Sequence, residues 1–297
     1  MRSFSRSWTM LFCFGLAACG SGGGGGIRMA ALTQTNAPAA AAQAPGMAEF
    51  LVGLTDLMSD LDPTFADGSG TWGELCDGGG VVDVTVQDLA PFRAASVGDS
   101  ASMNFRACAF ELGGEGFTLH GGLSFAITAL TRNGPDDFAV TLAVRLQGLS
   151  FTAPGVSFRA DGEYVLEVAT EDGEPYTTVV SGPSVTVSGQ VGGESIHLQA
   201  LDFRAEGTVN ETTGDFTYTM HGRLYDRAVV GAVDSTSVAD LSGTAPDYPS
   251  SGEVVLAGAK GSKVRVLVLD AVRVRLFVDA DGDGTYETTM DTTWDDL

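Results

Sequence analysis

Alternation of apolar and polar residues with a period of two dominates the chain from about residue 81 onward. In 82–86 every second residue is valine, which places the apolar side chains on one face of an extended strand. Further stretches alternate in the same way, or are rich in β-branched and aromatic residues, at 117–130, 138–149, 164–168, 185–187 and 216–224. Clusters of Gly, Asn, Asp and Pro, such as 133–135, 171–173 and 213–215, separate them and predict turns.

Strands joined by short turns, with no helical periods between them, predict an all-β antiparallel meander. We expect it to form a large sandwich or an open barrel-like sheet, with two smaller sheets as the alternative. The tripeptide Phe-Arg-Ala recurs at 92–94, 105–107, 158–160 and 203–205, which favours a body built from similar hairpins. The main β domain is predicted at 67–245 and a C-terminal β segment at 246–297.

The C-terminal segment predicts two neighbouring strands with a shared apolar face. Val264, Val266 and Val268 lie on one face of the first, and 272–278 supplies the same face of the second. A three-residue connection at 269–271 would set Val268 opposite Val272 and keep the faces together. The other face carries Arg265 beside Arg275, near Lys263 and Arg273. With Lys260 these are five basic residues directly before an acidic tail, and we expect them to pair with that tail rather than to bind an anion.

Helical spacing appears in one place, at 47–62, where apolar residues recur every three or four positions until Pro63. This pattern predicts an amphipathic N-terminal helix that packs on the β body; a partner-binding helix is the alternative. The stretch 19–46 before it is rich in Gly, Ala, Gln and Pro and is predicted to be a flexible linker.

The first 18 residues have the pattern of an export signal. Arg2 and Arg6 precede an apolar run at 8–18 that is too short to cross a hydrocarbon core of about 30 Å. The run ends in Leu-Ala-Ala-Cys at 16–19, which resembles the recognition sequence of the lipoprotein signal peptidase. We therefore expect cleavage before Cys19 and acylation of its thiol by palmitate-like chains; an ordinary secretory signal or a buried helix is the alternative. Gly20, where aspartate would resemble an inner-membrane retention signal, favours the outer membrane of a Gram-negative bacterium.

Charge and cysteine content extend this picture. Removing 1–18 takes away two of the 16 basic residues and none of the 38 acidic ones, which leaves a formal charge of −24. Such a chain is repelled by nucleic acid and by anionic lipid, which disfavours both as direct partners of the body. Cys13 leaves with the signal and Cys19 is acylated, so Cys76 and Cys108 remain and are predicted to form a disulfide outside the cytosol. A redox or metal pair is the alternative, but the sequence has no CxxC or nearby histidine to support it.

One motif predicts a metal site. Asp279, Asp281 and Asp283 have the spacing Asp-x-Asp-x-Asp-Gly, and Glu287 lies at the ninth position of the loop. Alternate carboxylates of this kind can converge on calcium. The pattern of a helix-loop-helix calcium site fails at its twelfth position, which is Met290. A solvated acidic turn without an ion is therefore the alternative.

Catalytic patterns are absent from the sequence. His120, His197 and His221 are scattered, and no metalloprotease, serine hydrolase or phosphate-loop motif occurs. The many carboxylates do not single out a glycosidase pair. We therefore expect a protein that is not an enzyme.

Several segments together suggest a family. Cys76-Asp-Gly-Gly-Gly, Gly98-Asp99-Ser100 and Asn104-Phe-Arg-Ala-Cys108 are followed at the C-terminus by Asp-Ala-Asp-Gly-Asp-Gly at 279–284 and by Trp294. This layout resembles uncharacterised proteobacterial lipoproteins, a family with no assigned activity, over about 75–297. The resemblance supplies no catalytic residues. From the sequence as a whole we expect a structural or binding role in the cell envelope, with the body periplasmic or surface-exposed. An envelope hydrolase acting on glycans or esters, and a lipid or lipoprotein carrier, are the alternatives.

Overall fold

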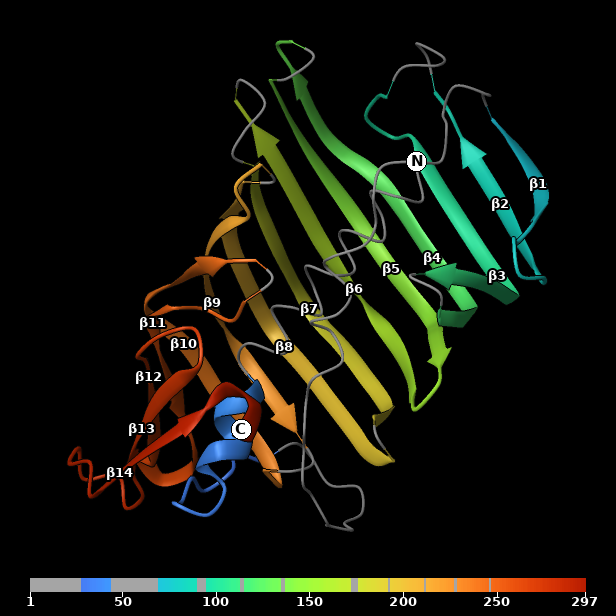
Figure 1. Ribbon diagram of the computed structural model, residues 1–297. Coiled ribbons are helices and arrows are strands. Elements are labelled where there is room, and N and C mark those ends of the chain that lie inside the picture. Colours follow the sequence, from blue (N-terminus) through green and yellow to red (C-terminus); the bar gives the residue numbers. More distant parts are fainter. Residues whose placement is uncertain are drawn as a thin grey trace.

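The computed structural model describes residues 28–43, 69–89, 95–112, 115–134, 137–171, 176–191, 193–210, 212–226, 229–245 and 247–297. They form one antiparallel sheet in which each strand pairs with its neighbours in the sequence (Figure 1). The 14 strands are β1 (Gly70–Leu75), β2 (Val81–Gln87), β3 (Ser100–Leu112), β4 (Glu115–Arg132), β5 (Phe138–Ala153), β6 (Val156–Thr170), β7 (Tyr176–Val191), β8 (Glu194–Val209), β9 (Asp215–Asp226), β10 (Gly231–Thr244), β11 (Ser251–Ala257), β12 (Lys263–Val268), β13 (Arg273–Asp279) and β14 (Thr288–Thr293). Short 3-10 turns occupy Ala259–Gly261 and Trp294–Asp296.

The predicted antiparallel meander is confirmed by this strand order. The strands belong to one sheet rather than to two, and because the order begins with β1 and ends with β14, the sheet is not closed. β10 pairs with β11, so the predicted C-terminal segment 246–297 continues the sheet of the main domain.

Alternating burial shows which face of the sheet forms the core. In β12 and β13 the side chains of Val264, Val266, Val274, Leu276 and Val278 are all buried, as the shared apolar face predicts. Buried apolar residues of β2 to β11 belong to the same contiguous cluster, which covers the inner face. The opposite face carries exposed polar and charged residues.

The predicted register between β12 and β13 is wrong by two residues. Val268 pairs with Val274, whereas Val272 lies in the connection and is 59% exposed. The cause is the turn: the Asp270 carboxylate accepts hydrogen bonds from the backbone N–H groups of Val272 and Arg273, at 3.0 and 2.8 Å. This side-chain cap stabilises a longer connection than the one predicted. A shift of two residues leaves every side chain on its predicted face.

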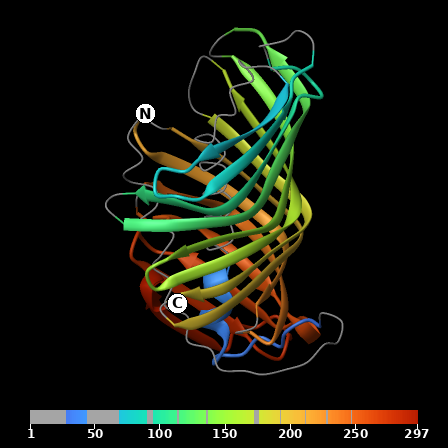
Figure 2. The same cartoon turned by 90° about the vertical axis from the view of Figure 1, so that its right-hand side faces the viewer.

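A row of irregularities crosses the middle of the sheet, and we call it the bulge row. It consists of residues with positive φ on β3, β4, β5, β6, β8 and β9, most of them beside a register shift: Ala107, Gly121, Gly148, Gly162, Asp202 and Gly222. Bulges bend a strand and increase its twist. Viewed edge-on, the sheet accordingly curls strongly instead of lying flat (Figure 2).

Two glycines show why the bulge row needs its residues. Gly121 has a φ of 92° and Gly148 a φ of 59°, both in the left-handed region that glycine adopts without steric cost. A Cβ atom on Gly121 would collide with the carbonyl oxygen of Gly148 on the neighbouring strand. The two strands can therefore approach each other at this point only with glycine at position 121.

The described part of the predicted linker, residues 28–43, is packed against the sheet, and we call it the N-terminal strap. Ala30 donates a hydrogen bond to the carbonyl of Ala232 at 2.8 Å, and the Ala232 N–H donates to the carbonyl of Arg28 at 2.8 Å. On its other side the Ala30 carbonyl accepts from the Ala259 N–H at 2.6 Å. The strap is thus held between the start of β10 and the turn before β12.

The strap ends in a short helical segment at 37–43, which lies within the curl of the sheet (blue in Figures 1 and 2). Its alanines are buried, among them Ala37, Ala40 and Ala41. Alanine-rich composition predicts a linker because it offers no large apolar side chain. In this fold the small side chains instead let the helix backbone approach the sheet closely, which buries the segment.

Several predicted features lie outside the described residues. They are the export signal 1–18, the acylation site Cys19 and the amphipathic helix 47–62. Within the part of the chain that the structure describes, no helix is long and apolar enough to span a bilayer.

Candidate metal centre

The connection between β13 and β14 brings together the four carboxylates that the sequence singles out. Asp279 is the last residue of β13 and is 1% exposed, while Asp281, Asp283 and Glu287 are exposed in the loop that leads to β14. Each of the four offers one oxygen atom, and these oxygens all lie within 4.8 Å of one another. The predicted convergence of the motif is therefore present, and the group could hold a metal ion.

Backbone amides of the same loop orient these carboxylates. The two oxygens of Asp279 accept hydrogen bonds from the N–H groups of Gly282 at 2.7 Å and Gly284 at 3.0 Å. Asp281 accepts from the Asp283 N–H at 3.1 Å. Glu287, just before β14, reaches back to accept from the Ala280 N–H at 3.2 Å. The loop is thus folded by its own acidic side chains and presents their remaining lone pairs toward one another.

The chemistry of this donor set suits a hard divalent cation. All four ligand groups are carboxylates, and oxygen-only sites of this kind prefer calcium or magnesium to transition metals. No histidine or cysteine belongs to the cluster. Four anionic groups this close repel one another, and a divalent cation among them would remove that repulsion.

The acidic loop packs against the turn that also holds the N-terminal strap. A Cβ atom on Gly282 would collide with the carbonyl oxygen of Lys260, so the two turns touch through their backbones. Lys263, the first residue of β12, pairs in register with Asp279. Three features, namely the acidic loop, the turn Ala259–Gly261 and the strap, are therefore neighbours at one end of the sheet.

Three of the five basic residues at 260–275 are paired with acidic groups of the same chain, but only Arg275 pairs with the acidic tail that was the predicted partner. The Arg265 guanidinium donates two hydrogen bonds to Glu253, at 2.8 and 2.6 Å, and Arg275 donates two to Asp291, at 2.5 and 2.9 Å. Arg273 pairs with Asp270, and this pairing, together with the backbone N–H groups of the turn, lowers the pKa of Asp270 to about 2. These arginines are therefore engaged and do not offer an open anion-binding patch.

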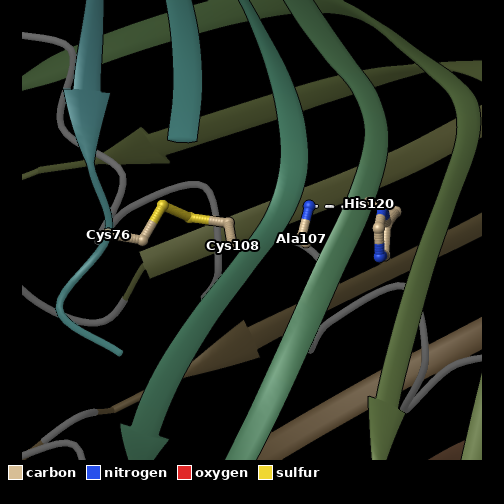
Figure 3. Close-up of a disulfide and its surroundings, with 4 residues drawn as sticks. All are labelled: Cys76, Ala107, Cys108 and His120. Atoms are coloured by element: carbon tan, nitrogen blue, oxygen red, sulfur yellow. Dashed lines mark hydrogen bonds between the residues drawn. A yellow bond between two sulfur atoms is a disulfide. The ribbon is translucent and has the colours of Figure 1, made fainter. Parts of the chain in front are cut away.

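The predicted disulfide between Cys76 and Cys108 is present, with Cα atoms 5.4 Å apart (Figure 3). It joins the turn after β1 to β3, and the backbone reinforces the link because Gly78 donates to the Ala109 carbonyl at 2.9 Å. Beside it, Ala107 of the bulge row donates its N–H to Nδ1 of His120 at 3.2 Å (Figure 3). The His120 side chain thus accepts a hydrogen bond from the backbone at the bulge.

A buried carboxylate to which the sequence pattern assigned no role fixes the connection before β3. Asp99 is 0% exposed and accepts hydrogen bonds from the N–H groups of Leu89 and Ser96, each at 2.7 Å, and from the Ser96 hydroxyl at 2.9 Å. All of these donors come from the loop, so Asp99 acts as its internal cap. The available signal was the Gly-Asp-Ser sequence, in which an aspartate follows a turn glycine.

The two other histidines lie apart from the acidic loop and from His120. His197 is on β8, where its ring meets the edge of Tyr225 at 5.8 Å between centroids, and His221 is on β9, opposite Arg204. Comparison of the chain with protein family models, with curated proteins and with solved structures found no match.

Proposed function

We propose that this chain is a lipid-anchored protein of the bacterial cell envelope, held at the outer membrane through Cys19, whose β body has a binding or structural role and carries calcium in its C-terminal loop. The observation that carries the proposal is the convergence of four carboxylate oxygens within 4.8 Å, at the residues that the sequence motif marks. The disulfide between Cys76 and Cys108 supports an extracytoplasmic location, because such bonds persist in oxidising compartments.

In this proposal the ion stabilises the C-terminal strands rather than taking part in a reaction. Asp279 ends β13 and Glu287 precedes β14, so an ion between them would link the last two strands of the sheet. β14 lies at the end of the strand order and pairs with β13 alone. A bound ion would therefore add a second connection to a strand that has one partner strand.

Calcium titration of the mature protein tests the loop. Extracellular calcium modules have dissociation constants of about 10⁻⁴–10⁻³ M, so about 10 mM calcium would stabilise the folded state by about 1.4–2.7 kcal/mol. For a body of this size we expect the unfolding midpoint to rise by about 3–10 °C relative to the protein in chelator. The measurement is thermal unfolding followed by tryptophan fluorescence.

The control variants separate the loop from general charge screening. Replacing Asp281→Asn and Asp283→Asn should remove the calcium-dependent rise, whereas Asp77→Asn, at an exposed position outside the cluster, should leave it unchanged. An unshifted midpoint of the wild-type protein at millimolar calcium would show that the loop is a plain turn.

The anchor is tested by changing the acylated residue. Cys19→Ser should release the protein from the membrane fraction into the soluble envelope fraction and abolish incorporation of labelled palmitate, because a serine side chain cannot carry the thioether-linked lipid. If the variant incorporates palmitate as the wild type does, Cys19 is not the acylation site.

A further inference from the structure

We infer that one end of the sheet, formed by the turn before β10 and the turn Ala259–Gly261, faces the lipid bilayer, so that the opposite end points away from it. This inference rests on the proposed acylation of Cys19 and adds to it an orientation of the body. The partner surface is a phospholipid bilayer. We call the two ends the strap end and the far end.

Toward its N-terminus the chain leaves the folded body at Arg28. Arg28 and Ala30 are fixed by backbone hydrogen bonds to Ala232 on one side and to Ala259 on the other. A Cβ atom on Gly231 would collide with the backbone of Ala30, which shows how closely the strap is seated. The chain that leads to Cys19 therefore starts at a fixed point on the body, at the strap end.

The distance between the anchor and the folded body is limited by the length of the tether that joins Cys19 to Arg28. Nine residue steps separate Cys19 from Arg28. Fully extended they span at most about 32 Å. The attachment point is thus always within about 32 Å of the acylated cysteine.

The body is longer than this tether. β10 begins directly after the attachment point and runs for 14 residues to Thr244, a length of roughly 45 Å. If the body stood upright with its far end on the bilayer, the attachment point would lie up to roughly 45 Å above the surface, beyond the roughly 32 Å reach of the tether. The upright inverted orientation is therefore disfavoured, whereas the strap end can lie at the surface within that reach.

The side chains at the strap end are compatible with a lipid surface. Val230 is 78% exposed and projects from the turn before β10, at a φ of 57°. The exposed cations Arg28, Lys260 and Lys263 surround the attachment point and can meet lipid phosphates. The exposed carboxylates of the acidic loop lie at the same end, so the surface is mixed in charge although the chain as a whole is strongly acidic.

Energy transfer to a lipid dye tests the orientation with a matched pair of variants. Val230→Cys and Ala245→Cys place one label just before β10 and one just after it, both at exposed positions. The lipidated full-length mature protein, labelled with a donor dye at the new cysteine, is reconstituted in vesicles of phosphatidylethanolamine and phosphatidylglycerol that contain an acceptor on the lipid headgroup. Because the two positions are roughly 45 Å apart along the strand, we expect transfer from position 230 to exceed transfer from 245 at least about threefold. Equal transfer, or more transfer from position 245, would overturn the orientation.

Two further measurements identify which part of the argument fails. Flotation of the lipidated protein with the vesicles, and its loss in Cys19→Ser, report on the anchor alone; a protein that does not float overturns the anchor and the orientation together. A protein that floats but shows equal transfer overturns the orientation only. Insertion of about 20 Gly and Ser residues after Gly26 extends the reach of the tether to about 100 Å and should bring the transfer ratio toward one. A ratio that the insertion does not change would show that the tether does not set the orientation.

Discussion

The disulfide between Cys76 and Cys108 should contribute a measurable share of the stability of the sheet. The perturbation is the double replacement Cys76→Ala and Cys108→Ala, which removes the bond without leaving a free thiol. The two cysteines are 32 residues apart, and closing a loop of that length lowers the entropy of the unfolded chain by an amount worth about 3–4 kcal/mol. Cys108 is fully buried, so the loss of its sulfur adds a small packing cost.

The fold should survive this change, because other contacts hold the same segments. β2 pairs with β3 along its whole length, and Gly78 and Gly79 exchange hydrogen bonds with Ala109 at 2.9 and 2.8 Å. We therefore expect a native-like variant whose free energy of unfolding is lower by about 3–4 kcal/mol, which corresponds to a thermal midpoint lower by about 6–16 °C at about 2–4 °C for each kcal/mol.

Urea unfolding with and without reductant measures the effect. The chain after the predicted export signal contains two tryptophans, Trp72 on β1 and Trp294 after β14, so fluorescence reports on both ends of the strand order. Reductant should destabilise the wild type to the level of the double variant and should leave the variant unchanged. If the reduced and oxidised wild type unfold at the same urea concentration, the loop-entropy argument does not apply to this bond.

Two other predictions concern the bulge row and the turn after β12. Gly121→Ala should destabilise the protein by about 2–4 kcal/mol, because its Cβ would collide with Gly148. Gly155→Ala is the control: Gly155 has a φ of 74° and open space around it, so the change should cost only about 1 kcal/mol of backbone strain. Similar losses for the two variants in urea unfolding would contradict the steric argument. The Asp270 carboxyl should titrate near pH 2 in NMR, since hydrogen bonds from Arg273 lower its pKa. Its folded pKa lies below the unfolded value, so its stabilising contribution is complete above about pH 4 and is lost as the pH falls toward 2. A titration midpoint near 3.8, the ordinary value, would show that the pairing is absent in solution.

The strand pattern was predictable from the sequence because burial on one face leaves a period of two in the apolar residues. That argument assigned Val264, Val266, Leu276 and Val278 to the core, and all four are buried. It could not give the register of β12 and β13, because the length of the connection depends on how Asp270 caps its own turn. Periodicity determines faces, whereas turn geometry determines which residues are opposite each other.

The described Phe-Arg-Ala repeats coincide with the bulge row, which the sequence alone did not indicate. In the described copies they lie along the bulge row: Ala107 of the first copy has a φ of 52°, and the third copy directly follows Asp202, whose φ is 47°. In the copy at 158–160, the Arg159 guanidinium lies where a side chain on Gly148 would be. The repeat thus marks the irregular part of β3, β6 and β8. Sequence similarity shows that the tripeptide recurs but not where its copies lie in space.

For the candidate metal centre, the sequence predicted all four residues correctly as a group, because the spacing of the motif itself brings alternate carboxylates round a tight turn. The contacts that join this loop and the strap to the turn before β12 were not predictable. The contact between Gly282 and Lys260 depends on the strand order, and the contact between Ala30 and Ala259 joins residues from opposite ends of the chain. Alanine-rich sequence carries no periodic signal that could have indicated such a contact.

The N-terminal strap has a consequence for the order in which the protein folds. The meander forms from hairpins whose partners are adjacent in the sequence, and such local contacts form quickly. Leu32, in contrast, donates its N–H to the Ser262 hydroxyl across 230 residues. The strap cannot dock until β10 and the turn before β12 have been synthesised. Docking of the strap therefore comes late in folding, and a chain truncated before residue 259 would lack the Ala259 N–H and the Ser262 hydroxyl that hold the strap on one side.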